Sequence, residues 1–266
     1  MKNLKEIHTF VICAYKESPF LEKCILSLKK QIVESSIIII TSTPNAYISK
    51  MADKYDIPLY INKGERGIVQ DWNFGYRKCK TPYVTIAHQD DIYFKDYAKN
   101  AIKMLKNSKQ PLIFFSNYCE IRKDEFVYKN RLLQIKRFLL MPLRLSIFRG
   151  SRFIRRRSLS LGNAICCPSV TFAVKNLPDP VFNVHFRSDE DWEAWEKISK
   201  LKGEFLYDAG ILMAHRIHEE SETSVILGEN ARYTEDYEMF CKFWPKWIAK
   251  TMVKFYSMSE QSNKVG

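Results

Sequence analysis

The chain lacks several features that would place it in other classes of protein. No stretch of about 18 uncharged apolar residues occurs, so we expect no transmembrane helix, which leaves peripheral membrane contact open. The start of the chain has neither a long apolar run nor a small-residue cleavage site, so no secretory signal is expected. The seven cysteines never form a C-x-x-C pair, which is usual for buried, reduced thiols. We therefore expect a cytoplasmic protein.

Glycine is scarce, and one long segment contains no acidic residue. Only 9 of the 266 residues are glycine, and none lies in the N-terminal stretch "VICAYKESPF", where a nucleotidyltransferase would carry a Gly-rich phosphate loop. Between Phe126 and Pro178 there is no Asp or Glu, while Lys and Arg accumulate among apolar residues. The formal net charge of +12 predicts an anionic partner such as a nucleotide, a nucleic acid or an acidic lipid surface.

The first hundred residues alternate two patterns. Short β-branched and apolar runs, typical of buried strands, occupy residues 7–15, 35–43, 57–62 and 82–87. Amphipathic helical patterns lie between them at residues 18–31, 45–55 and 67–79, with Ser18 as the expected N-cap of the first helix and Pro19 at its first position. This alternation predicts an open, mainly parallel sheet with right-handed crossovers, in which ligands bind at the carboxyl ends of the strands.

The stretch "VTIAHQDDIYF", residues 84–94, places polar groups at that edge. An apolar run ends in His88, Gln89, Asp90 and Asp91, and adjacent carboxylates repel each other unless a cation lies beside them. A divalent metal ion is one candidate for this cation. The alternative is that Asp90 and Asp91 only cap a helix beginning near Tyr93.

Four ordered stretches together resemble a known enzyme family. They are "FVICAYKESPFLEKCILSLKKQ", "NFGYRKCKTPYVTIAHQDD", "EDWEAWEK" and "HRIHEES", within residues 7 to 220. The chain resembles the family 2 glycosyltransferases, which are inverting enzymes with a nucleotide-sugar-binding GT-A fold. The resemblance implies an α/β fold with a Rossmann-like, mainly parallel central sheet flanked by helices. We expect a GT-A domain at residues 1–220, including a basic acceptor-side or membrane-facing segment at 126–178, and a helical C-terminal extension at 221–266.

The resemblance also assigns a metal site. The second stretch is similar to the segment that leads into the family's D-x-D motif, with His88 at the first Asp position and Asp90 at the second. Asp90 would therefore bind Mn²⁺ or Mg²⁺, and His88 is a departure from the motif. Carboxylates suit both ions, and a nearby imidazole favours Mn²⁺. Asp91 would support the motif or cap the following helix.

A general base is expected in the third stretch. By similarity to the family's ED motif, Asp191 would accept the proton of the acceptor hydroxyl, and Glu190 would anchor the loop or orient the acceptor. The alternative is an acidic first turn that complements the dipole of a helix whose apolar stripe includes Trp192 and Trp195. Both interpretations can hold together.

The late histidines are similar to the family's R-x-H element. The resemblance makes His218 a candidate metal or diphosphate contact, with Arg216 supporting phosphate. His215 and His218 could also be ordinary core or surface histidines.

The donor and acceptor sites complete the set of expected residues. The family's acidic turn after the second strand is replaced here by "ITSTPNAY", whose hydroxyls could still bind a base or ribose, and Asp71 could substitute or be a solvated helix carboxylate. The expected donor contacts are Ala14, Tyr15, Glu17, Thr41, Ser42, Asp71, Asn73, His88, Gln89 and Arg216. On the acceptor side we expect Asn163 and Ser169.

The leading hypothesis is a metal-dependent inverting transferase of a hexosyl or related sugar, with a glycan or lipid-linked acceptor at the cell surface. No Q-x-x-R-W signature occurs, which disfavours a processive synthase. Residues 131–157 would contact the inner face of the cell membrane or cover the acceptor. The alternatives are a nucleotidyltransferase, a non-catalytic relative and a basic protein that binds anionic surfaces or nucleic acid. No RNP-like, zinc-finger or basic-zipper signature occurs, so no nucleic-acid partner is expected.

Overall fold

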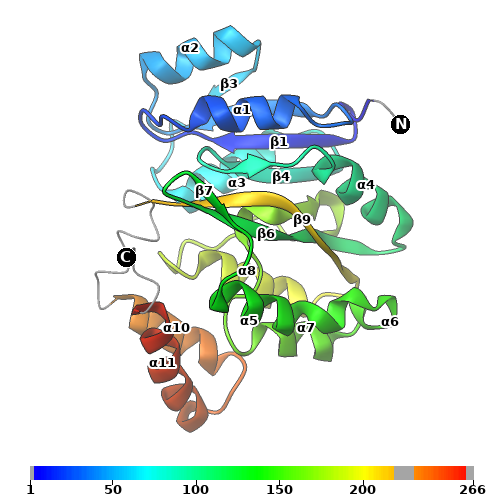
Figure 1. Ribbon diagram of the computed structural model, residues 1–266, viewed down its shortest axis with the longest axis vertical. Helices are drawn as coiled ribbons and strands as arrows, with labels where there is room; N and C mark the ends of the chain where they lie inside the picture. The colour runs from blue at the N-terminus through cyan, green and yellow to red at the C-terminus, as the bar shows by residue number, and fades with distance from the viewer. Residues whose placement is uncertain (1–2, 219–230, 262–266) are drawn as a thin grey trace.

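The protein is described by a computed structural model that covers residues 3–218 and 231–261. A twisted central sheet runs through the molecule, with helices packed on both of its faces (Figure 1). Its strands are β1 His8–Cys13, β2 Ser36–Thr41, β3 Leu59–Ile61, β4 Tyr83–His88, β5 Ile92–Tyr93, β6 Pro111–Arg122, β7 Glu125–Val127, β8 Val170–Ala173 and β9 Glu204–Ile217. The strand order is β3-β2-β1-β4-β8-β6-β9-β5, with β7 paired to β6.

The predicted parallel arrangement is confirmed for the first half of the sheet. Strands β3, β2, β1 and β4 are mutually parallel, whereas β8 is antiparallel to β4 and to β6. Strand β9 then pairs in parallel with β6 along most of its length. The fold class is the predicted α/β class, and the mixed second half brings the end of β9 to the edge where β4 ends.

The helices are α1 Leu21–Lys29, α2 Ala46–Tyr55, α3 Ile68–Lys78, α4 Tyr97–Asn107, α5 Arg131–Leu140, α6 Ser146–Arg149, α7 Arg152–Leu159, α8 Glu190–Ser199, α10 Ala231–Cys241 and α11 Lys246–Gln261. Short 3₁₀ turns are η1 Met141–Arg144, η2 Cys167–Ser169 and η3 Val174–Asn176. Among the described residues, no helix has the length and apolar character needed to cross a membrane.

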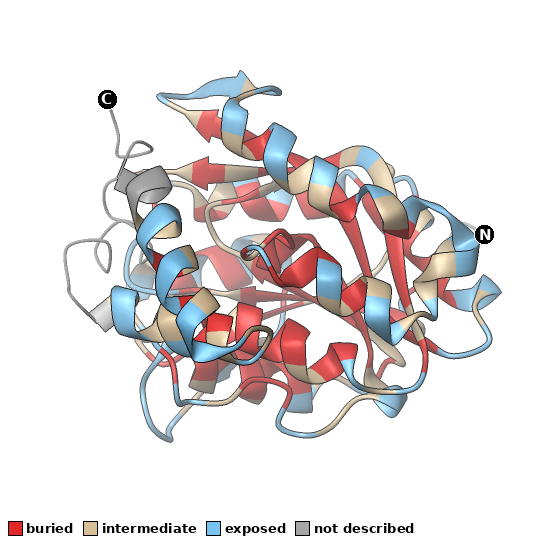
Figure 2. Ribbon diagram, turned by 90° about the horizontal axis from the view of Figure 1, so that it is seen from below, coloured by how far each residue is buried: buried red, intermediate tan, exposed pale blue. Residues whose placement is uncertain are grey.

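Alternating residues of the strands build two apolar cores. In β1, Phe10 and Ile12 pack in the cluster that includes α1, α2 and α4, while Val11 packs in the cluster that includes α3 and α8. All three side chains are fully buried, and Figure 2 shows the strands buried between helices whose outer sides are exposed. This is the alternation that a strand covered on both faces requires.

Two helix starts differ from the prediction. Helix α1 begins at Leu21, and Ser18 does not cap it, because residues 18–20 form a turn in which Leu21 N bonds Ser18 O. Helix α4 begins at Tyr97 and not near Tyr93, because Ile92–Tyr93 is instead strand β5, paired with β9. Asp90 and Asp91 therefore do not cap a helix, and that alternative is wrong.

The C-terminal helices pack on one another and on α8. Trp192 of α8 lies in an apolar cluster with Met239 and Phe240 of α10 and with Ala249 and Val253 of α11. The proposed start of the C-terminal extension, residue 221, lies outside the described residues.

Gly75 lets α3 lie close to the sheet. A Cβ at this position would lie 2.5 Å from Cγ1 of Val11 in β1. We expect Gly75→Ala to lower the free energy of unfolding by roughly 1 to 3 kcal/mol through overpacking, as measured by urea denaturation. Gly150→Ala is the matched control, because its Cβ would meet nothing closer than 4.0 Å. Equal urea midpoints for the two variants would contradict this account of the packing.

Candidate active site

The carboxyl ends of the parallel strands meet at one edge of the sheet. Cys13 at the end of β1 is paired with Ile40 of β2 on one side and with His88 of β4 on the other. The polar residues that follow these strands therefore converge, as the sequence predicted. Strand β9 adds Arg216 and His218 to the same edge, because β5, just after β4, pairs with Ala214 and Met213 of β9.

Asp90 and His218 form a part-buried pair. His218 Nε2 donates to Asp90 Oδ2 over 2.9 Å, and the two side chains are 25% and 19% exposed. Burial alone would raise the pKa of Asp90, but the hydrogen bond from His218 and the nearby His88 and His215 outweigh it and lower that pKa. The carboxylate is therefore ionised and accessible.

Asp91 has a different task, because it is completely buried. Its Oδ1 accepts hydrogen bonds from His215 Nδ1 over 3.0 Å and from the backbone N–H of Arg216 over 2.9 Å. Burial would lower the pKa of His215, but the charge and hydrogen bond of Asp91 raise it. Asp91 thus links the segment after β4 to β9 and fixes the position of the His215 ring, whereas the neighbouring Asp90 is partly exposed.

His88, at the first position of the motif, is not part of the Asp90–His218 pair. The His88 ring stacks on Trp72 of α3, with centroids 5.4 Å apart and an interplanar angle of 15°. Burial lowers the pKa of His88, so the ring is neutral at pH 7. Next to it, the amide of Gln89 bonds both the N–H and the C=O of Tyr15, each over 3.0 Å, and so fixes the loop after β1.

Asp191 lies in the first turn of α8. Its Oδ1 accepts from Asn163 Nδ2 over 2.8 Å and from the Trp192 N–H over 2.7 Å. Burial raises the pKa of Asp191, and these two hydrogen bonds offset part of the rise. The charges of Asp191 and of Asp90 both act on the His88 ring, which lies between the two motifs. The neighbouring Glu190 is buried, and the first turn of α8 carries three acidic residues, so the helix-dipole interpretation holds as well.

Part of the expected donor site is brought together at the ends of β2 and β3. Asp71 is buried and accepts from Ser42 Oγ over 2.7 Å and from Asn62 Nδ2 over 2.8 Å. The interpretation of Asp71 as a solvated carboxylate is therefore wrong. Thr41 Oγ1 accepts from the Thr43 N–H over 3.0 Å in the same turn. Of the residues after β1, Ala14 is buried, while Tyr15 and Glu17 are exposed.

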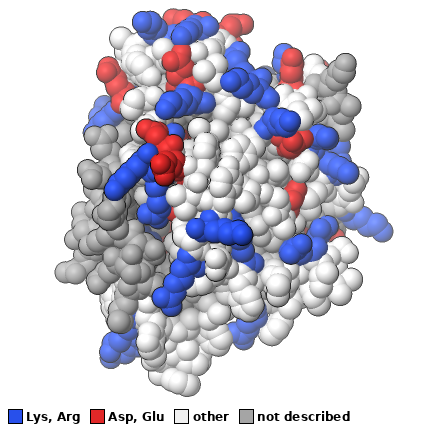
Figure 3. Space-filling model, viewed as in Figure 1, with Lys and Arg blue, Asp and Glu red and all other residues white. Residues whose placement is uncertain are grey.

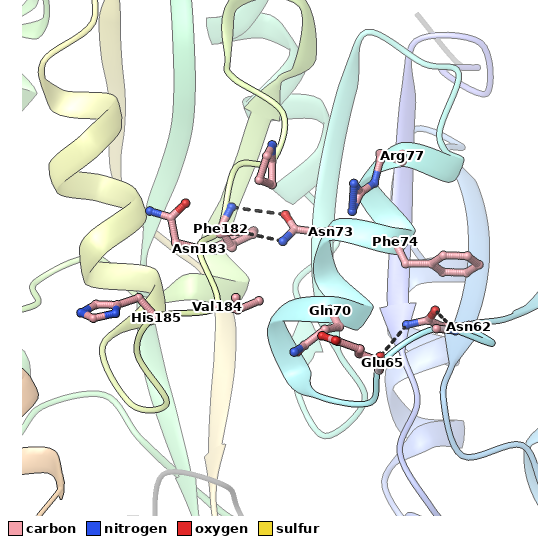
Figure 4. A pocket seen from close by; sticks show the side chains of 12 residues that line it. Asn62, Glu65, Gln70, Asn73, Phe74, Arg77, Phe182, Asn183, Val184 and His185 are labelled. Atoms are coloured by element: carbon pink, nitrogen blue, oxygen red, sulfur yellow. Dashed lines mark hydrogen bonds between the residues drawn. The ribbon is translucent and has the colours of Figure 1, made fainter.

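Asn73 organises a neighbouring wall. Its side-chain amide bonds both the N–H and the C=O of Phe182, so it is already used within the protein (Figure 4). Between α3 and residues 180–185 lies a cavity of about 860 Å³, lined among others by Gln70, Arg77 and His185.

The two acceptor-side predictions have different surroundings. Asn163 holds Asp191, as described above. Ser169 is completely buried and donates to the Cys166 carbonyl over 2.7 Å. Arg216 is also largely enclosed: its guanidinium bonds Asp124 Oδ1 over 2.8 Å and the Asp90 carbonyl over 3.1 Å, and stacks over the Phe20 ring.

Lys136 was not among the site residues expected from the sequence. The Nζ atom of this α5 residue lies over the Tyr118 ring, 5.7 Å from its centroid. Burial would lower the pKa of Lys136, but Tyr118, Cys166 and Asp191 raise it. In the sequence, Lys136 is one of many Lys and Arg residues in the basic segment. The charge of Lys136 in turn lowers the pKa of Asp191, the expected general base.

The residues at Asp90 fit a divalent cation only as part of its coordination shell. Within the part of the chain that the structure describes, no group of three or more His, Cys, Asp or Glu side chains is arranged to hold a metal ion. A carboxylate and an imidazole 2.9 Å apart are nevertheless the donor types that Mn²⁺ accepts, with other positions left to phosphate oxygens and water.

Comparisons with solved structures give the same fold at low sequence identity. S. aureus TarS 1-349 in complex with UDP-GlcNAc has a TM-score of 0.62 and 12% identity, over 93% of this chain and 70% of that chain. Mannosyltransferase PcManGT from Pyrobaculum calidifontis, in complex with GDP-Man and Mn2+, has a TM-score of 0.62 and 14% identity, over 92% and 69%. Glucosyl-3-phosphoglycerate synthase from Mycobacterium tuberculosis has a TM-score of 0.58 and 14% identity, over 90% and 80%.

Sequence comparisons address the family directly. A search of curated proteins finds no match. The family model described as glycosyl transferase family 2 matches residues 9–173, which is more than half of the chain and includes β1, β4 and the Asp90 motif. With the GT-A fold of its structural neighbours, this match shows that the chain is a glycosyltransferase and belongs to glycosyl transferase family 2.

Proposed function

We propose that the protein is a metal-dependent inverting glycosyltransferase, which moves one sugar from a nucleotide-sugar donor to a hydroxyl of a cell-surface or lipid-linked glycan. The observation that carries the proposal is that the carboxylates of Asp90, after β4, and Asp191, in the first turn of α8, have pKa values shifted in opposite directions. Asp90 is part-buried, with a lowered pKa and a hydrogen bond from His218, whereas Asp191 accepts a hydrogen bond from Asn163 and has a raised pKa. Environments that push two pKa values apart are typical of separate roles in catalysis.

In this mechanism, Asp90 and His218 would hold Mn²⁺ or Mg²⁺ at the donor diphosphate. The chemistry that such a cation would supply there is Lewis-acid neutralisation of the charge on the leaving diphosphate. As a ligand, His218 would present the lone pair of Nε2 to the cation, in the tautomer that carries its proton on Nδ1. Arg216 donates a hydrogen bond to the Asp90 carbonyl and so fixes the backbone that carries the Asp90 carboxylate.

Asp191 accepts the proton of the attacking hydroxyl. Its hydrogen bonds from Asn163 and the Trp192 N–H orient the carboxylate, and the raised pKa makes it a stronger base than an exposed Asp. A single displacement with the base on the acceptor side inverts the anomeric carbon. The nucleoside is proposed to bind at the end of β2, where Thr41 and Ser42 lie near Asp71 of α3. Glu190 is proposed to orient the acceptor.

The proposed acceptor or membrane face is the basic segment, residues 131–157. Its apolar side chains include Phe138, Ile147 and Phe153, which are 69%, 77% and 66% exposed. On the face seen in Figure 3, almost all acidic side chains lie in the upper half, away from this segment. Several cations are nevertheless structural: Arg155 is buried and bonds the carbonyls of Gly203 and Leu201.

Calorimetric titration of Mn²⁺ with a panel of nucleoside diphosphates tests the metal site. We expect one diphosphate to bind only with Mn²⁺, and Asp90→Ala to lose this binding because its carboxylate holds the cation. Asp191→Asn is the control and should retain it. Metal-independent binding, or equal binding by Asp90→Ala, would overturn the assignment.

The pH dependence of donor turnover tests the base. Since burial raises the pKa of Asp191, activity should fall with decreasing pH at a value above that of an exposed Asp. Asn163→Ala removes a hydrogen bond that lowers this pKa, so it should move the acid limb to higher pH, and Asp191→Asn should reduce turnover by about 10² to 10⁴. Asn176→Ala, which removes a bond to the Pro111 carbonyl, is the matched control. An unmoved acid limb in Asn163→Ala argues for another base.

Charge reversal tests the membrane contact of the basic segment. Arg144 and Arg149 belong to η1 and α6. Their replacement by Glu should weaken binding of the protein to vesicles that contain phosphatidylglycerol, because each cation near such a surface contributes about 1 kcal/mol. Flotation on a density gradient measures the effect, and unchanged flotation would remove this part of the proposal.

A further inference from the structure

Helix α11 carries two chemically different faces. Its inner face consists of Ala249, Met252, Val253 and Tyr256, which pack in the cluster around Trp192. Its outer face follows the i, i+3, i+4, i+7, i+8 spacing of one side of a helix and is formed by Trp247, Lys250, Thr251, Lys254 and Phe255, all of them exposed. We call these five residues the α11 outer face.

The aromatic residues of the α11 outer face are unusually exposed. Trp247 is 74% exposed and Phe255 is 70% exposed, values above those of all other exposed large apolar residues in the described chain except Ile147. Packing of α11 against α8 and α10 does not require Trp247 or Phe255, because the residues of the inner face already make that contact. Exposed large apolar side chains that gather on one face mark an interaction surface.

The charge of this helix limits what can bind there. Lys246, Lys250 and Lys254 are exposed, and none of them forms an ion pair with a described carboxylate. From residue 246 to residue 257 the sequence contains no acidic residue. A second copy of the chain, docked through the same face, would bring the lysines of both copies together without a compensating charge. The binding partner is therefore expected to be anionic.

The α11 outer face is tied to the basic segment. Trp244, just before α11, donates to the Ser160 carbonyl over 2.7 Å and lies under Arg157, whose guanidinium is 4.6 Å from the ring centroid. Arg156 bonds the Lys242 carbonyl over 2.8 Å. In Figure 1, α10 and α11 lie at the same lower end of the molecule as α5, α6 and α7. The two surfaces are therefore held together by the fold.

We propose that the α11 outer face is a membrane-binding surface, which inserts Trp247 and Phe255 at the level of the lipid headgroups while its lysines bind anionic lipid. A helix that lies in the interface requires this combination of aromatic anchors, flanking cations and an absence of acidic residues. A bilayer also accounts for the aromatic groups, because Trp and Phe side chains insert at the level of the headgroups. The inference adds a second contact to the membrane part of the proposed function and does not depend on the metal or on Asp191.

The test is the binding of the full-length protein to vesicles of phosphatidylcholine with and without phosphatidylglycerol. We expect binding only with phosphatidylglycerol, a shift of Trp247 emission to shorter wavelength, and loss of that shift in Trp247→Phe. The double variant Lys250→Glu/Lys254→Glu should bind at least about tenfold more weakly. Lys29→Glu/Lys30→Glu, at exposed positions of α1 and its C-cap, changes the net charge equally and should bind as the wild type does.

Three outcomes would overturn the inference. They are the absence of wild-type binding, the same binding by the α11 and α1 charge variants, and binding that persists unchanged in Trp247→Ser/Phe255→Ser, which would show electrostatic attraction without insertion. Loss of binding with Arg144→Glu/Arg149→Glu but not with the α11 variants would leave the basic segment as the contact and remove α11. Circular dichroism and retained Mn²⁺-dependent nucleotide binding would show that each variant is folded, and they keep this test separate from that of the active site.

Discussion

The candidate active site depends on the buried carboxylate of Asp91. It accepts one hydrogen bond from the side chain of His215 and one from the backbone of Arg216, which fastens the end of β4 to β9 across more than 120 residues of sequence. A buried carboxylate is costly without such partners, and the raised pKa of His215 favours the protonated form that carries the opposite charge. Because β9 is held here, Arg216 and His218 reach Asp90, so the part-buried Asp90–His218 pair depends on the buried Asp91–His215 pair.

Asp90 and Asp91, the two carboxylates of this loop, therefore have different roles because they differ in burial. Asp91 is enclosed and serves the structure, whereas Asp90 is accessible and available to a cation. The change from Asp to His at position 88 fits this arrangement, since a neutral ring stacked on Trp72 occupies the position without adding a third negative charge. For Asp191, the hydrogen bond from Asn163 and the charge of Lys136 lower the pKa and offset part of the rise caused by burial.

Much of the fold could be predicted, because the alternation of buried strands and amphipathic helices is local in sequence. The position of Asp90 at the end of β4 followed from that alternation together with the motif. The contacts His215–Asp91 and Lys136–Tyr118 could not be predicted, because they depend on how β9 pairs with β6 and how α5 packs over the sheet. Burial also separates residues that look alike in the sequence: Asp71 is enclosed by Ser42 and Asn62, and Arg155 serves the fold while Arg144 and Arg152 are exposed.

In the proposed mechanism, Asp90 and His218 together hold a divalent cation at the donor diphosphate. Pulsed electron paramagnetic resonance of bound Mn²⁺ would detect this arrangement, because a nitrogen ligand gives a hyperfine coupling that oxygen ligands do not. With Mn²⁺ and the nucleoside diphosphate present, we expect a coupling to histidine nitrogen in the wild type, its loss in His218→Ala, and loss of the bound Mn²⁺ signal in Asp90→Ala. A wild-type spectrum without nitrogen coupling, or one that is unchanged in both variants, would show that Asp90 and His218 do not hold the cation together.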